Sequence, residues 1–351
     1  MSPLVKNTML LLGSIIGAGI LSLPIVLTQS GWLVYIFYLV ALGFLLSQNN
    51  KMYREIVDAS KTKHQLSGYV QLILGKRIAT LSSFLHIFSN FGALLAYLIL
   101  GGTFIGFIFA IPSYIGTIIF YTITTIFLIY FEKWLRLLEV YFTFIKIALI
   151  LCTIIIGINQ IDGMHIFALP AIGHNPIITY GVILFALNGF TIIPELQNRK
   201  DMNKSIYIAE ILAVTIYIFF AFTFAGRSQD DFFNFPSREI GLLFSITGFF
   251  LVLTPYLLIS WVNYDSFTQD HNFSKSKAHL IGLLVPAILF LIGITSFLQV
   301  ISITGGIFFG SIGIIISIMY LKKFPRKKSL IVYLNIIIMV IGMIQQIYTL
   351  F

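Results

Sequence analysis

Charged residues are scarce in this chain, and their scarcity decides the class of protein. Only 10% of the 351 residues are Asp, Glu, Lys or Arg, whereas 58% are hydrophobic. The mean hydropathy of +0.97 lies far outside the range of soluble globular domains. Uncharged stretches of roughly 20 residues recur, each long enough to cross about 30 Å of hydrocarbon. The sequence therefore predicts an all-α integral membrane protein without a sizeable soluble domain.

The chain has only one cysteine and no cluster of catalytic residues, and each shortage excludes a class of structure or function. Cys152 is the single cysteine, so no intrachain disulfide can form. The sequence has no metal-ligand cluster, no phosphate-binding loop and no nucleophile with a neighbouring base. We therefore expect neither an enzyme, nor an ATP-driven pump, nor a protein with a bound metal or cofactor.

The basic residues are distributed in a way that indicates membrane topology rather than nucleic-acid binding. The net charge is +9, but Lys and Arg fall in alternate loops, and the intervening loops hold only Arg227 and Arg238. Under the positive-inside rule the N-terminus is cytoplasmic, and an odd number of spans places the C-terminus outside. We expect a multi-pass protein of the cell (plasma or inner) membrane. It should contact the lipid bilayer and bind no nucleic acid, and the sequence does not indicate its oligomeric state.

About eleven apolar segments are long enough to be membrane helices. They cover approximately residues 7–27, 32–47, 78–107, 114–131, 137–158, 176–196, 205–225, 240–261, 278–297, 301–321 and 330–350. A short amphipathic helix on the membrane surface is expected within residues 65–74.

Two of these segments contain signals that interrupt a helix. Residues 13–19 of the first span hold three glycines, each of which weakens a helix by roughly 1 kcal/mol. The sixth span contains Asn188-Gly189, followed by Pro194. Unpaired backbone groups are costly in lipid, so a broken span survives only where it lines a polar cavity or holds a polar ligand. The alternative is that these glycines only allow close helix packing.

The interrupted spans are five apart, which predicts an inverted repeat typical of secondary transporters. The repeats would cover about residues 7–158 and 176–321, and an extra helix would cover 330–350, all within one transmembrane domain of residues 1–351. N–H groups at the first break suit a carboxylate, and carbonyls at the second suit an ammonium group, so a small zwitterionic amino acid is the expected substrate. The candidate substrate-binding residues are Ser14, Ile16, Gly17, Ala18, Gly19, Phe185, Leu187, Asn188, Gly189 and Phe190, with Asn90 as a weaker candidate.

Lys146 lies nine residues into the fifth span, roughly 14 Å deep. A lysine at this depth needs an internal partner, either carbonyls freed at the first break or a hydroxyl such as Ser245 or Thr254. A buried lysine can exchange a proton near neutral pH, so Lys146 is a candidate for proton coupling, in preference to sodium coupling. Alternatively, it is a fixed positive charge that replaces a bound cation.

Three further ionisable residues have two interpretations each. Glu195 is either a proton relay or a gate or loop cap, and His86 either titrates near physiological pH or is packed with hydrogen bonds. Glu210 is expected near the cytoplasmic end of its span, either solvated or paired with a lysine.

Three segments carry a resemblance to a known family. Residues 13–24, GSIIGAGILSLP, resemble the first-helix signature of the amino acid-polyamine-organocation superfamily, especially its amino acid/auxin permease and tryptophan/tyrosine permease branches. Residues 185–195 are similar to the sixth-helix signature, and residues 144–149, around Lys146, to the fifth helix of proton-coupled members. The resemblance implies a five-plus-five, LeuT-like fold, alternating access, and a lysine where sodium-coupled relatives bind sodium.

The expected function is secondary active amino acid transport, coupled to protons and directed inward. The rival is an amino-acid-sensing membrane subunit of the same fold, similar to those of bacterial spore germination receptors, which would bind amino acids without net transport. The sequence alone does not separate the two.

Overall fold

The computed structural model describes residues 2–62, 64–131, 135–158, 169–173, 178–196, 201–225, 237–327 and 329–348. The regular structure of these residues is helical throughout. Eight helices are long and apolar enough to cross a membrane, or nine if one sharply bent pair counts as a single span. The protein is therefore a multi-pass membrane protein, and the total of eleven spans stays a prediction.

The described chain forms two successive groups of helices. The first comprises α1 (Pro3–Ile15), α2 (Gly19–Ser30), α3 (Trp32–Asp58), α4 (Leu66–Leu74), α5 (Lys76–Phe109), α6 (Ser113–Phe131) and α7 (Leu135–Ile158). The second comprises α9 (Ile178–Ala186), the 3₁₀ helix η2 (Phe190–Glu195), α10 (Met202–Thr223), α11 (Arg238–Asp265), the π-helical turn η3 (Ser266–Asp270), α12 (Lys275–Leu291), α13 (Phe297–Ile303), the π-helical turn η4 (Thr304–Phe309), α14 (Gly310–Lys323), the 3₁₀ turn η5 (Pro325–Lys327) and α15 (Leu330–Tyr348).

The expected segments correspond to these helices with differences at their ends. The short amphipathic helix is α4, and the extra C-terminal helix is α15. Helix α3 continues to Asp58, well past the expected end at Ser47, because its apolar stripe runs on into the connection. Residues 159–175 and 226–239, which separate expected spans, lie mostly outside the described residues.

Both expected interruptions are present. Helices α1 and α2 are bent by 58° at the residues between them, where Ile16 has an extended backbone (φ −77°, ψ 94°). Helix α9 ends at Ala186, and regular structure resumes at Phe190 as a 3₁₀ helix. Each of these two spans is therefore split into two half-helices.

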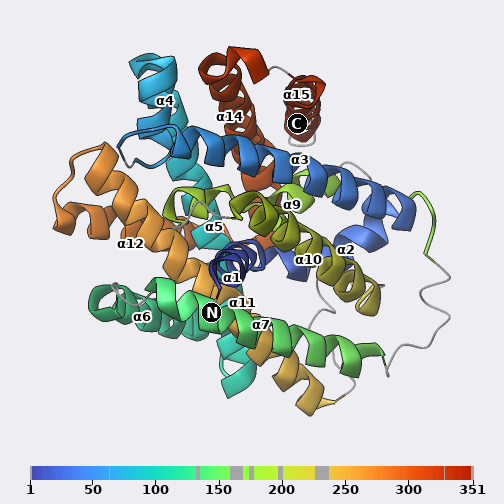
Figure 1. Ribbon diagram of the computed structural model, residues 1–351. Helices are drawn as coiled ribbons and strands as arrows, with labels where there is room; N and C mark the ends of the chain where they lie inside the picture. Colours follow the sequence, from blue (N-terminus) through green and yellow to red (C-terminus); the bar gives the residue numbers. More distant parts are fainter. Residues whose placement is uncertain are drawn as a thin grey trace.

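The broken spans lie inside the bundle. Figure 1 shows α1 almost end-on near the centre, with α6 and α7 to one side and α3, α14 and α15 to the other. Helix α1 contacts α7 and α10, and α2 contacts α9 and α10. These contacts bring the two breaks together, although 170 residues separate them along the chain, as counted from Gly19 to Gly189.

Candidate substrate and coupling site

Both breaks line one small cavity. From the predicted set, the cavity wall contains Ser14, Gly17 and Gly19 of the first break and Phe185 and Asn188 of the second. The remaining wall residues come from the two breaks and from α5, α11 and η4, and they are Ile15, Ala93, Tyr97, Thr191, Ile259 and Phe309. In this conformation the cavity has room for about one water molecule. An amino acid can fit only after the surrounding side chains move.

The other five predicted residues are not among those that line the cavity. Ile16, Ala18 and Leu187 are completely buried. A β-carbon added to Gly189 would lie 2.9 Å from Ile15 Cγ1, so Gly189 lets α1 approach the second break closely. Phe190 packs its ring edge-on against Phe309, with the centroids 5.6 Å apart.

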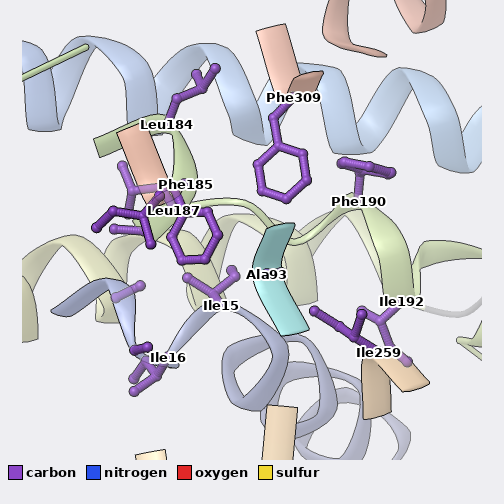
Figure 2. Packing of buried hydrophobic residues seen from close by; sticks show 14 of the residues in the cluster. Ile15, Ile16, Ala93, Leu184, Phe185, Leu187, Phe190, Ile192, Ile259 and Phe309 are labelled. Carbon is purple, nitrogen blue, oxygen red and sulfur yellow. The ribbon is translucent and has the colours of Figure 1, made fainter. Parts of the chain in front are cut away.

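Aromatic rings close one side of the cavity. Phe309 stacks on Phe185 with a centroid separation of 5.8 Å, and Figure 2 shows it reaching toward the second break between Phe185 and Phe190. The Tyr97 ring lies 6.3 Å from that of Phe185. Tyr97 and Phe309 belong to other spans, and no local sequence pattern distinguishes them from the many aromatic residues of this chain. Their rings make this part of the cavity apolar, apart from the Tyr97 hydroxyl.

Gly17 and Gly19 are required for steric reasons as well as for breaking the helix. A β-carbon on Gly19 would lie 2.5 Å from Ala186 Cα, a contact that folded proteins do not tolerate. A β-carbon on Gly17 would lie 3.1 Å from the Tyr97 hydroxyl and 3.3 Å from Pro255 Cγ. These glycines therefore lie at an interrupted helix and also allow close packing.

Lys146 forms hydrogen bonds with backbone carbonyls at the first break. It is fully buried, and its Nζ donates to the carbonyls of Gly13 at 2.8 Å and Ile16 at 3.4 Å. Of the two kinds of partner considered, it uses the freed carbonyls, and the Ser245 and Thr254 hydroxyls have no hydrogen-bond partner among the described residues. Its charge thus stabilises carbonyls that the break removes from the helical hydrogen-bond ladder.

Tyr217 of α10 links the two breaks, and sequence reasoning did not identify it. Its buried hydroxyl lies 2.9 Å from the Ile15 carbonyl and 2.8 Å from the Ala186 carbonyl. These are the last residues of α1 and α9. The single hydroxyl proton of Tyr217 is therefore shared by the last carbonyls of both half-helices.

The end of η2 is fastened by two buried polar groups. Arg54 Nη1 donates to the Ile193 carbonyl at 3.3 Å and the Leu196 carbonyl at 2.8 Å, and the rest of its guanidinium makes a bidentate pair with Asp58. Glu195 Oε1 accepts from Gln65 Nε2 at 2.7 Å. Glu195 is thus part of a contact between η2 and the residue preceding α4, away from the cavity wall.

His86 and Glu210 differ from their expected environments. Both ring nitrogens of buried His86 lack a hydrogen-bond partner within the described chain, and its ring lies 5.8 Å from that of Phe190. The hydrogen-bonded packing considered for His86 is therefore not observed. Glu210 is neither solvated nor paired with a lysine, because it is 3% exposed and neither carboxylate oxygen has a partner among the described residues. Asn90, the weaker candidate, donates to Asn263 at 2.7 Å and does not line the cavity.

Solved structures of membrane transporters have the same fold. The manganese transporter of Eremococcus coleocola, in complex with an aromatic bis-isothiourea substituted compound, matches with a TM-score of 0.74 at 12% identity over 99% of this chain and 85% of that chain. MhsT in complex with L-phenylalanine matches with a TM-score of 0.71 at 13% identity over 98% of this chain and 97% of that chain. The fold is thus the LeuT-like fold found in these transporters, as expected.

The family follows from the sequence itself. Residues 3–226, more than half of the chain, match the family described as transmembrane amino acid transporter protein. The chain belongs to this family, which lies within the superfamily indicated by its motifs. No curated protein matches the chain.

Proposed function

We propose that this protein is a secondary active transporter that takes up a small amino acid together with a proton, by alternating access. The observation that carries the proposal is the cavity lined by both helix breaks. A transporter of this class needs a polar site that can open to either side of the membrane, and half-helices on both sides of the site provide it.

The two breaks offer complementary charge to a zwitterion. The N-terminal end of α2, at residues 17–19, has a positive partial charge and suits the substrate carboxylate. The C-terminal end of α9, near Leu187, has a negative partial charge and suits the ammonium group. Ser14, Asn188 and Thr191 add polar side chains to the wall. The rings of Phe185 and Phe309 favour a substrate with an apolar side chain.

Lys146 is the proposed coupling residue. Its ammonium binds the Gly13 and Ile16 carbonyls, so loss of the proton would weaken the bonds that fix the first break. Protonation and the geometry of the substrate site would then depend on each other. Glu195 and His86 are secondary candidates, and we propose a proton rather than sodium as the coupling ion. The cytoplasmic N-terminus, the external C-terminus and the repeats at 7–158 and 176–321 belong to the same proposal.

The test is uptake by purified protein in liposomes. A thermal-shift screen of the twenty amino acids first identifies those that bind. A radiolabelled binder should accumulate inside liposomes when the outside is more acidic, and a protonophore should abolish the accumulation. Binding without any movement of label would overturn the proposal and favour the sensing function. Accumulation that requires a sodium gradient and ignores pH would overturn the choice of ion.

A further inference from the structure

Glu210 is a deeply buried carboxyl group that the site described above does not use. It lies eight residues after the start of α10 at Met202, about 12 Å along the helix. It is 3% exposed, and neither oxygen has a hydrogen-bond partner among the described residues. An ionised carboxylate without a partner is strongly disfavoured in such a place.

Glu210 and the second helix break share a neighbour, Gly43 of α3. A β-carbon built on Gly43 of α3 would be 3.7 Å from Glu210 Oε1 and 3.6 Å from Leu187 Cδ1. Leu187 belongs to the unwound segment between α9 and η2. Glu210 and this segment thus pack around the same point of α3.

Other polar groups continue from Glu210 in both directions along α10. Tyr217 is seven residues further along, on the same face of the helix, and its hydroxyl contacts both breaks. Tyr207 is three residues earlier, and it exchanges hydrogen bonds with Gln48 of α3 at 3.0 and 3.4 Å. The α3–α10 interface thus carries polar side chains on both sides of the buried acid.

Charges on the neighbouring helices do not neutralise Glu210. Helix α2 has no titratable side chain, and α1 has only Lys6, which is exposed. The other groups to consider are Tyr35, which is bound to the Tyr217 carbonyl, Lys51 beyond Gln48, Arg54 bound to Asp58, and Lys146 at the first break. None of these groups forms an ion pair or hydrogen bond with Glu210 in the described part of the chain.

We propose that Glu210 is a proton-binding site of the transport cycle, in addition to Lys146, and this inference rests on the proposed function. The carboxylic acid keeps its proton while the helices stay closed around it. Movement of the second break admits water, the O–H bond breaks, the proton passes to water, and the carboxylate remains hydrated. Closure of the break requires a proton to return, which ties the movement of the substrate site to proton transfer.

The experiment compares Glu210→Gln with Glu210→Asp in liposomes. Gln has nearly the shape of the neutral acid but cannot release a proton. We expect Glu210→Gln to lose at least tenfold in accumulation driven by a pH gradient, while exchange of labelled for unlabelled substrate stays within twofold of wild type. Asp at this position should keep measurable pH-driven accumulation. Glu239→Gln, at an exposed carboxylate, is the matched control and should behave as wild type.

The retained exchange shows that Glu210→Gln is folded, and a second measurement does not depend on transport. A hydrophobic carbodiimide modifies buried protonated carboxyl groups, so mass spectrometry should find Glu210 of the wild-type protein labelled and Glu239 unlabelled. Unlabelled Glu210, or normal pH-driven accumulation by Glu210→Gln, would overturn this inference alone. A wild-type protein that moves no amino acid would overturn the proposed function, and the transport role of Glu210 with it.

Discussion

Replacing Tyr217 with Phe tests whether the two helix breaks are held together by a shared hydroxyl. The substitution keeps the buried ring and removes only the oxygen atom that lies 2.9 Å from the Ile15 carbonyl and 2.8 Å from the Ala186 carbonyl. Tyr217 is fully buried, so no solvent is available to replace the lost donor. The closed arrangement of α1 and α9 should therefore become less stable.

The size of the effect follows from the number of donors lost. A single O–H group is removed, and leaving a buried acceptor without its donor costs about 1–3 kcal/mol. A conformation in which α1 and α9 have separated does not use this bond and loses nothing. The equilibrium should therefore shift toward the separated conformation by about 5- to 150-fold.

The assay measures access to the cavity. Cys152→Ser removes the only cysteine, and Ser14→Cys then places a thiol in the cavity wall. A membrane-impermeant maleimide should label this thiol at least fivefold faster when Tyr217→Phe is added. Tyr180→Phe is the matched control, because it removes a buried tyrosine hydroxyl that binds the Met339 carbonyl of α15 at 3.2 Å, away from α1.

Two results would refute this reasoning about Tyr217. One is an unchanged labelling rate combined with an unchanged unfolding temperature in detergent. The other is an equal acceleration by Tyr180→Phe, which would show that general loosening of α9, and not the link between the breaks, controls access.

Three further predictions concern the same region. Lys146→Ala should insert normally but lose the pH dependence of uptake, and an unaltered pH profile in liposomes would contradict its coupling role. Gly17→Val should reduce substrate affinity in a thermal-shift titration by at least tenfold, because a β-carbon at this position lies 3.1 Å from the Tyr97 hydroxyl. Gly282→Val is the control and should bind substrate normally, because no atom lies within 4 Å of a β-carbon added there. Arg54→Gln should weaken the attachment of η2 by about 1.5–3 kcal/mol, since two carbonyls lose a charged donor. Amide hydrogen exchange at Ile193, Glu195 and Leu196 should rise, and unchanged exchange would exclude this role.

Much of the candidate site could be predicted because its signals are local. The glycines at 13, 17 and 19 weaken one helix wherever it packs, and Asn188-Gly189 weakens another. Lys146 needed a partner inside the membrane for the same kind of reason, since a charge at that depth cannot stay alone. The two alternatives for its partner were separated only when the structure placed Nζ at the Gly13 carbonyl.

The residues that sequence reasoning missed depend on contacts between distant segments. Tyr217 is 202 positions from Ile15 and 31 from Ala186, and nothing around it distinguishes it from the other tyrosines of the chain. Phe309 likewise reaches the cavity only because η4 packs against α9. Glu210 was expected near the cytoplasmic end of its span, either solvated or paired with a lysine, but α10 begins earlier than expected, and the carboxyl group is buried near Gly43 of α3.

The sequence by itself determined that this is a membrane protein with two broken spans and a buried lysine. Hydrophobicity, helix propensity and the cost of burying a charge depend on each residue and its neighbours in the sequence. Only the tertiary structure decided which side chains meet at the breaks, because that depends on how helices far apart in the chain pack against one another.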